Sequence, residues 1–204
     1  MPRRGLDRAA VVEAAVALAD AESVEGVTFA RLAERLGVRG PSLYNHLPGL
    51  DGLRRELAVR GLRELARLLG RAAIGRSGDA ALVALADAYR DFARAHPGLY
   101  AAAQRAPDPA DPEWNALSAE VVGIVVAVLA GYGLAGDDAV HALRGLRSLM
   151  HGFVSLETGG GFGLPLDIDE SYSRLVRAFA AGLRPERGDP GEPSPPRRSR
   201  APRR

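Results

Sequence analysis

Two short amphipathic segments separated by a glycine turn are the feature that most constrains this chain. Residues 29–36 hold apolar side chains at three- and four-residue spacing, after Thr28, which is suited to cap a helix, and before Gly37, which suits a left-handed helix end. Pro41 then opens a second predicted helix that reaches about Leu47. Two helices joined in this way form a helix-turn-helix, whose second helix presents its N-terminal residues to the major groove of DNA.

The second predicted helix carries hydrogen-bonding side chains opposite its apolar face. Leu43 and Leu47 are expected to face inward, which leaves on the outside Ser42, Tyr44, Asn45 and His46. Taken singly, each has a plainer interpretation, such as a half-buried core tyrosine, a solvated histidine or a helix-neutral asparagine. Together, after a glycine turn and in a net basic segment, they favour contact with DNA.

The N-terminal part of the chain resembles the TetR-type bacterial repressors. The resemblance rests on the first predicted helix, from Asp7 to about Glu22, on the segments TFARLAERLGV and SLYNHL, and on the long helix that follows. It implies phosphate contacts for Tyr44 and His46, and base contacts for Arg39, Gly40, Pro41, Ser42 and Asn45. Thr28, at the start of the first helix of the motif, completes the predicted DNA-facing set.

Two positions depart from the pattern of that family. Leu50 stands where a lysine commonly opens the next helix, and Gly40 stands where a longer polar side chain is frequent. One phosphate contact is therefore expected to be absent, and Arg54 or Arg55, one turn further on, would supply the positive charge instead. Because Gly40 has no side chain, more of the base recognition is expected from Arg39 and Asn45.

The charge is divided along the chain in a way that fits this interpretation. Residues 1–76 carry 13 arginines against 9 acidic residues, residues 77–183 carry 7 against 13, and residues 184–204 carry 7 against 3. A polyanion is attracted to both ends and repelled by the middle, as expected if only part of the chain binds DNA. The arginines of the tail suggest the further hypothesis of an added attraction to phosphate.

The remainder of the chain is predicted to be helical, because no stretch shows sustained alternation of apolar and polar residues. Predicted helices cover residues 50–69, 79–95, 113–132, 137–157 and 169–183, with a short one after Pro97 and a proline-rich loop at 106–112. We therefore predict an all-α chain with a three-helix helix-turn-helix DNA-binding domain (1–48), a linking helix (49–76), a helical effector-binding and dimerisation domain (77–184) and a disordered tail rich in arginine and proline (185–204).

Membrane insertion and secretion are not expected. The run from Val121 to Ala135 is apolar but too short and too rich in glycine for a span of about 20 residues, so we predict a helix buried in the second domain. The N-terminus runs directly into a helix that carries acidic residues, unlike a signal peptide. The chain has no cysteine, which fits a reducing cytoplasm and excludes disulfides and thiol catalysis.

Apolar stripes on the last two predicted helices suggest a homodimer. The expected interface residues are Leu143, Leu146, Val154, Leu175, Val176, Phe179 and Leu183. Packing within one chain explains part of each stripe, but two such hairpins paired across a two-fold axis would form a four-helix bundle. The resemblance points the same way, since TetR-type proteins dimerise through their last two long helices, which sets two recognition helices against a near-palindromic operator.

Aromatic and soft side chains gather in neighbouring helical segments of the second domain. They are Tyr89, Phe92, His96, Tyr100, Trp114, Leu117, Met150, His151 and Phe153. These residues either fill the core or line an apolar pocket for a small molecule. By analogy with the TetR-type proteins we predict a pocket for an apolar or aromatic effector of unknown identity, whose binding releases the DNA.

Two other classes of function are weighed against this one. An enzyme is disfavoured, because the chain lacks a zinc-binding HExxH helix, a GxSxG nucleophile turn and a phosphate loop between a strand and a helix, and no catalytic residue, metal ligand or cofactor is predicted. An architectural nucleic-acid-binding protein without an effector is the stronger alternative. It would bind without sequence preference and lose affinity steeply as salt rises.

Overall fold

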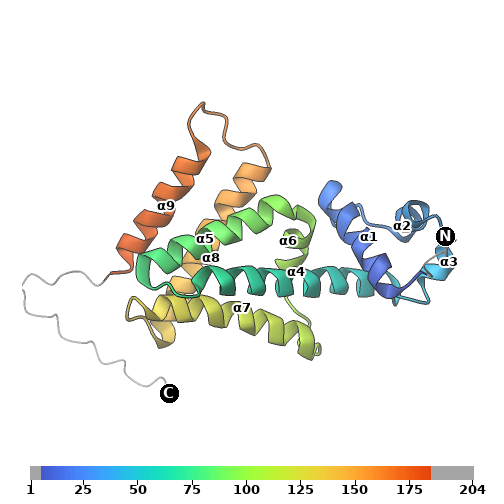
Figure 1. Ribbon diagram of the computed structural model, residues 1–204, viewed down its shortest axis with the longest axis horizontal. Coiled ribbons are helices and arrows are strands. Elements are labelled where there is room, and N and C mark those ends of the chain that lie inside the picture. Colours follow the sequence, from blue (N-terminus) through green and yellow to red (C-terminus); the bar gives the residue numbers. More distant parts are fainter. Residues whose placement is uncertain (1–5, 185–204) are drawn as a thin grey trace, which may run out of the picture.

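The computed structural model describes residues 6–184, and every regular element in that range is an α-helix. The helices are, in chain order, α1 (Arg8–Ala21), α2 (Phe29–Leu36), α3 (Gly40–Leu43), α4 (Gly49–Ala73), α5 (Gly78–Ala95), α6 (Pro97–Ala103), α7 (Pro112–Ala130), α8 (Gly136–Thr158) and α9 (Ile168–Gly182). The all-α prediction is confirmed for this range, and the predicted tail, 185–204, lies outside it. In Figure 1, α1–α3 form a head (residues 6–48) at one end of α4, and α5–α9 form a body (residues 78–184) around the other.

Local signals set the helix ends in the head. The Asp7 carboxylate accepts a hydrogen bond from the Ala10 N–H at 2.7 Å and caps α1. The Thr28 hydroxyl accepts one from the Arg31 N–H at 3.3 Å and caps α2 in the same way. Gly37 ends α2 in the left-handed conformation at φ 64°, as its position after the last apolar residue predicts.

The second helix of the motif is shorter than predicted. α3 ends at Leu43, and residues 44–48 form tight turns in place of the helix that we expected to reach Leu47. Pro48 disfavours the helical conformation at Leu47, directly before it, so the helix is not expected to include that residue. Leu43 and Leu47 are both buried, as predicted, so the turns remain anchored to the core of the head.

α4 is one continuous helix that joins the head to the body (Figure 1). Its apolar face is buried from Leu53 to Leu69. The helix continues to Ala73, one turn further than predicted, although Gly70 lies inside it. Packing of this last turn beside α7, where Ile124 approaches Gly70, outweighs the roughly 1 kcal/mol cost of a glycine in a helix.

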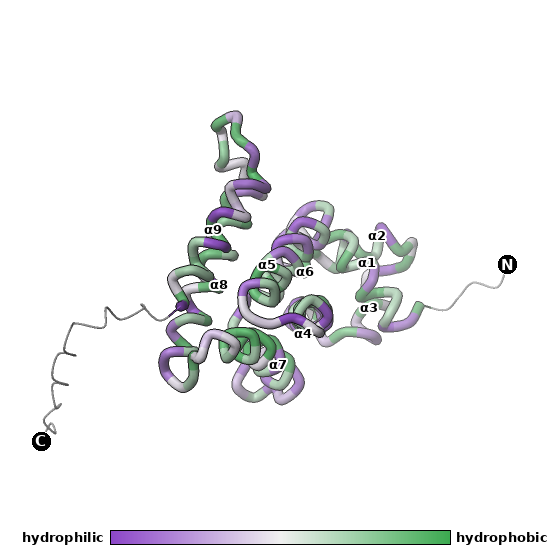
Figure 2. The backbone as a smooth tube through the Cα atoms, turned by 60° about the vertical axis from the view of Figure 1, so that its left-hand side comes forward, coloured by the Kyte–Doolittle hydropathy of each residue, from purple (hydrophilic) through white to green (hydrophobic). Residues whose placement is uncertain are grey.

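α7 lies beside α4 at the surface of the body, and the prediction of a buried helix over residues 121–135 is wrong. Its 18-residue apolar window is only 22% buried, and Val122 keeps 46% of its surface exposed. Figure 2 shows the hydrophobic colour along most of this helix. By length and hydropathy α7 is the one helix in residues 6–184 that would suffice to cross a membrane, which is weak support for such a role.

A buried arginine ties the last two helices to α5. The Arg90 guanidinium donates hydrogen bonds to both oxygens of Glu157 in α8, at 2.8 and 2.6 Å, and lies 2.7 Å from the Asp169 carboxylate in α9. It also stacks over the Tyr172 ring, 4.9 Å from its centroid. Because the Arg90 side chain is only 8% exposed, this cluster fixes the position of the α8–α9 hairpin on the body.

Candidate nucleic-acid interface and internal cavity

The turn after α3 presents polar side chains to solvent, as the sequence predicts. Tyr44 is 64% exposed, and its ring packs edge-on against Phe29 with the centroids 4.7 Å apart. Arg39 and Asn45 are exposed and His46 is half-buried. The contact with Phe29 fixes the ring of Tyr44 while its hydroxyl stays free, so the tyrosine is held ready for a hydrogen bond to an outside group.

Two hydroxyls of the predicted set are already engaged within the head. The Ser42 hydroxyl donates to the Arg39 carbonyl at 2.6 Å, so in this conformation it has only lone pairs to offer to a base. The Thr28 hydroxyl uses a lone pair for the α2 cap and keeps its O–H free to donate to a phosphate oxygen. Gly40 and Pro41 form the start of α3 and carry no long side chain, which leaves room for close approach of a duplex.

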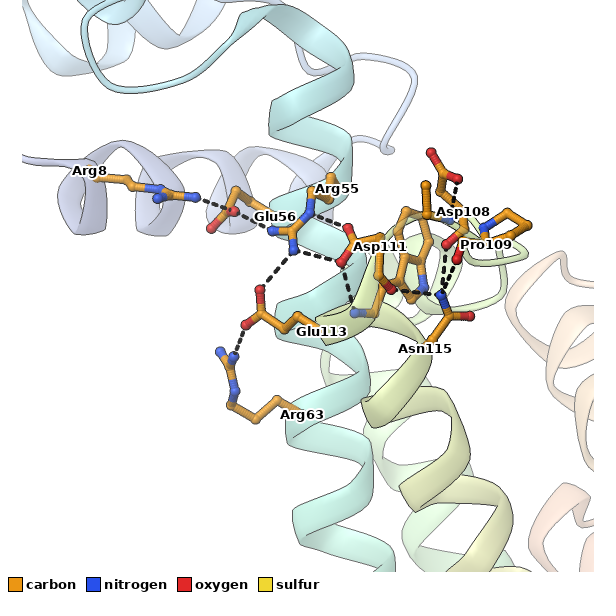
Figure 3. A network of polar contacts seen from close by, with 11 residues as sticks. Arg8, Arg55, Glu56, Arg63, Asp108, Pro109, Asp111, Glu113 and Asn115 are labelled. Carbon is orange, nitrogen blue, oxygen red and sulfur yellow. Dashed lines mark hydrogen bonds and ion pairs between the residues drawn. The ribbon is translucent and has the colours of Figure 1, made fainter.

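The two arginines that were expected to replace the missing phosphate contact behave differently. Arg54 forms only an exposed pair with Asp51 at 3.3 Å, which is easily exchanged for a phosphate. Arg55 instead donates to Asp111 through two nitrogens and to Glu113 at 2.8 Å, as Figure 3 shows. The expectation that Arg55 could serve DNA is therefore wrong, because its charge is committed to the body.

This arginine and its carboxylate partners form a polar network between the start of α4 and the start of α7 (Figure 3). Hydrogen bonds from Arg55 lower the pKa values of Asp111 and Glu113 below their usual range. The same two carboxylates raise the pKa of Arg55. Asp111 also caps α7 by accepting from the Trp114 N–H at 3.1 Å, so the network couples the first turns of α7 to α4.

The head meets the body where α1 packs against the N-terminal end of α6, a contact we call the seam. The Asp20 carboxylate accepts hydrogen bonds from the Gly98 and Leu99 N–H groups at 2.9 and 3.2 Å, and its second oxygen lies 3.0 Å from Nδ1 of His96. Gly98 permits this approach, because a Cβ there would lie 2.3 Å from the carbonyl carbon of Ala19. His96, predicted to line a ligand site, belongs to the seam instead.

The body forms a partly open cavity of about 310 Å³ between α4, α5, α7, α8 and the segment that follows α6. This volume is at the lower end of the range for small-molecule sites. Of the residues predicted to bind a ligand, Tyr89 and Met150 line it. Leu143, predicted at the dimer interface, lines it too. Sequence patterns gave no signal for Gln104, Arg105 and Ser118, which long-range packing brings to the same cavity.

Tyr89, which lines the cavity, is the first member of a chain of hydrogen-bonded side chains. The Tyr89 and Tyr100 hydroxyls are 3.1 Å apart, and the Tyr100 hydroxyl lies 2.5 Å from Nδ1 of His151. Burial raises the pKa of both tyrosines, so their hydroxyls keep their protons at neutral pH. Tyr100 and His151, predicted to line the ligand site, are thus placed one layer behind it, where they orient Tyr89.

The other aromatic and apolar residues of the predicted ligand site lie outside the cavity lining. Phe92 is 1% exposed in the core, and Phe153 packs against the ring of Tyr172 beside the buried arginine. Trp114 is buried near the start of α7, and Leu117 packs against the core one turn later. For these four residues the interpretation as core packing is the correct one, because large apolar and aromatic side chains fill the interior first.

The residues predicted for the dimer interface likewise fall into two groups, those buried within their own chain and those that keep exposed surface. Leu146, Val154 and Val176 are almost fully covered by their own chain, so their assignment to a dimer interface is wrong. Leu175 remains exposed, and Phe179 and Leu183 are partly buried. An amphipathic stripe identifies apolar positions, but it does not tell whether the covering surface belongs to the same chain.

Comparisons with known proteins place these features in context. A family model described as "Tetracyclin repressor-like, C-terminal domain" matches residues 82–179. The uncharacterized HTH-type transcriptional regulator YobS of Bacillus subtilis is 44% identical over 183 residues, which cover 89% of this chain and 95% of that protein.

Solved structures share the fold at lower identity. A protein of unknown function from Rhodococcus sp. RHA1 aligns with a TM-score of 0.75 and 24% identity, over 90% of this chain and 98% of that one. A TetR variant from Acinetobacter baumannii AYE in complex with minocycline aligns with a TM-score of 0.64 and 22% identity, over 87% and 96% of the two chains.

Proposed function

This chain belongs to the TetR family of helix-turn-helix transcriptional regulators, and we propose that it is a dimeric repressor released from its operator by a small molecule bound in the body. Its relatives are transcriptional regulators rather than enzymes. In this proposal the head binds DNA, α4 links the two parts, and the body binds the effector and the second subunit. The protein would act in the cytoplasm, where DNA is accessible to it.

The exposed group of side chains on both sides of α3 is the observation that carries the DNA-binding role. Tyr44 and His46 offer donors to phosphate, whereas Arg39 and Asn45 offer the charged and amide groups that read guanine and adenine in the major groove. Arg54 and the free O–H of Thr28 supply further phosphate contacts in this proposal. Pro41 and Gly40 set the approach distance, and Ser42 accepts from a base amino group.

The exposed faces of α8 and α9 support a two-fold dimer. Leu156 and Leu175 are exposed on these helices, and Phe179 packs against the helical Gly145 of α8, 3.2 Å from where its Cβ would stand. Pairing the hairpins of two subunits would cover Leu175, Phe179 and Leu183 in a four-helix bundle. Two heads would then reach successive major grooves about 34 Å apart.

α6 supplies a physical link between the cavity and the head. Ala103 and Gln104, at its C-terminal end, line the cavity, and its N-terminal end carries the seam to Asp20 of α1. A ligand that shifts this short helix would therefore displace α1. Such a ligand changes operator affinity only to the extent that it binds the released conformation more tightly than the DNA-bound one.

The experiment that tests this function is DNA binding to an inverted repeat. We expect footprinting at physiological salt to protect a discrete inverted repeat near the coding region of this protein, and sedimentation at micromolar concentration to give a dimer. Binding of equal strength to unrelated duplexes, with a steep loss in salt, would support the architectural alternative instead. A monomer in sedimentation would contradict the dimeric part of the proposal.

A further inference from the structure

The cavity in the body has an asymmetric lining, with a wide apolar surface and positive charge as its only formal charge. Leu62, Leu65 and Leu69 of α4 form one wall, and Val121 and Val125 of α7 contribute to another. The charged side chains in the lining are two arginines, Arg105 and Arg147, and no carboxylate of the described residues joins them there. We infer that the effector is an amphipathic carboxylate, with an apolar body against α4 and α7 and its head group at these arginines.

The polar groups of the lining lie close enough to act together. The Arg147 guanidinium donates to Oε1 of Gln104 at 3.2 Å, and Nε2 of Gln104 donates to the Tyr89 hydroxyl at 3.4 Å. Gln104 is also the direct chain neighbour of Arg105. Both arginines thus belong to one end of the cavity, where the polar groups of the described lining are hydrogen-bond donors or neutral acceptors.

Neither of these arginines has an acidic partner among residues 6–184. In the body part of this range the ion pairs involve Arg90, Arg94, Arg174 and Arg184, but not Arg105 or Arg147. A carboxylate matches the planar fork of a guanidinium with two parallel hydrogen bonds, and such charge-assisted bonds are stronger than neutral ones. A cationic ligand of the same shape would meet two like charges there and is disfavoured.

The position of one arginine connects this ligand class to regulation, a step that rests on the proposed function. Arg105 lies two residues after the end of α6, whose other end holds the seam, and the same segment continues to Asp111 in the polar network with α4. A head group bound by Arg105 would pull on a segment anchored to α1 of the head at one end and to the first turns of α4 at the other. Contacts with the apolar lining alone would not transmit the effect of ligand binding to the head in this way.

The test uses three probes of matched length, namely decanoate and decylammonium below their micelle concentrations and decanol below its solubility limit. A ten-carbon chain suits the cavity, because about 310 Å³ corresponds to roughly ten water-sized groups. Calorimetry on the full chain should give decanoate an affinity about tenfold or more above that of decanol, with decylammonium weakest. The double variant R105Q/R147Q should bring decanoate down to the level of decanol and leave decanol unchanged.

Arg144 supplies the matched control, since it lies on α8 one turn from Arg147 but outside the cavity lining. R144Q should keep the full preference for decanoate. Equal affinity for the three probes, failure of all three to bind, or a preference for decanoate that survives in R105Q/R147Q would each overturn the inference. Operator binding is measured on the same samples without ligand, so that the two proposals can fail separately. Absence of operator binding would contradict the proposed regulator function, whereas the carboxylate preference is judged by calorimetry alone.

Discussion

Replacing Gly98 by alanine tests whether close backbone packing at the seam holds the head against the body. A Cβ at this position would lie 2.3 Å from the carbonyl carbon and 2.5 Å from Cβ of Ala19, whereas ordinary contacts begin at 3.4 Å. The clashing atoms belong to the backbone of α1 and to its shortest side chain, so no flexible group can turn aside. α1 and α6 must therefore separate by about 1 Å.

The magnitude follows from two opposing effects. Overpacking of a filled contact costs about 1–3 kcal/mol, and separation also lengthens the hydrogen bonds from the Gly98 and Leu99 N–H groups to Asp20. Alanine is favoured over glycine within a helix by at most about 1 kcal/mol. The clash dominates, so we expect Gly98→Ala to lower the free energy of unfolding by about 1–2 kcal/mol. Operator affinity should fall as well, because α1 is displaced.

Urea unfolding of Gly98→Ala beside Gly123→Ala decides the question. Gly123 lies in α7 with no atom within 4 Å of a built Cβ, so its replacement should raise the free energy of unfolding by up to about 1 kcal/mol. If Gly98→Ala is as stable as the wild type, or gains as much free energy of unfolding as Gly123→Ala, then α1 and α6 can separate without loss of stability and the reasoning is refuted.

Three further predictions concern single side chains. Arg90→Ala should cost about 3–5 kcal/mol in urea unfolding, because it leaves the Glu157 carboxylate, 13% exposed, without its partner. Tyr44→Phe should weaken operator binding by about tenfold in a gel-shift titration without changing thermal stability, because only an exposed hydroxyl is lost. Arg55→Gln should reduce acid sensitivity. The lowered pKa of Asp111 means that its pair with Arg55 stabilises the fold above the ordinary carboxyl pKa and is lost as pH falls through the lowered value. Stability measured from pH 7 down to 2 should therefore fall less in the variant.

Each of these predictions has a control and a contrary outcome. Arg94→Ala removes a more exposed arginine from the same cluster and should cost less than about 1 kcal/mol, so equal losses would count against the buried pair. Tyr132→Phe removes a hydroxyl bonded to Asp79, far along the chain from the head, and should leave operator binding unchanged. A pH profile of Arg55→Gln that parallels the wild type would mean that the network contributes nothing to acid stability.

The head is predictable from sequence because its signals are local. The Thr28 cap, the left-handed Gly37 and the buried Leu43 all depend on neighbours within a few residues, and each is found where the pattern places it. Only the length of α3 is wrong, and Pro48 gives a local reason for its not reaching Leu47. Local rules suffice when a structure of a few turns satisfies its own backbone groups.

The cavity and the interfaces are less predictable, because they depend on what packs against each helix. The apolar positions of Leu146 and Val176 are evident in sequence, but nothing local says that their own chain covers them. The converse holds for α7, whose apolar run indicates a buried helix and which nevertheless keeps much of its surface exposed. Arg105 and Arg147 are 42 positions apart, and tertiary packing alone places them on one cavity.

The unbroken course of α4 has a mechanical consequence. With 25 residues the helix is about 37 Å long, so a tilt of about 10° at the body end would carry the head end through about 6 Å. A small tilt of α4 around a bound molecule would therefore move the head by a distance comparable to the spacing of neighbouring phosphates on DNA. Substitutions in the cavity lining can thus change which ligand the body binds, while the DNA-facing residues of the head, at the other end of α4, stay the same.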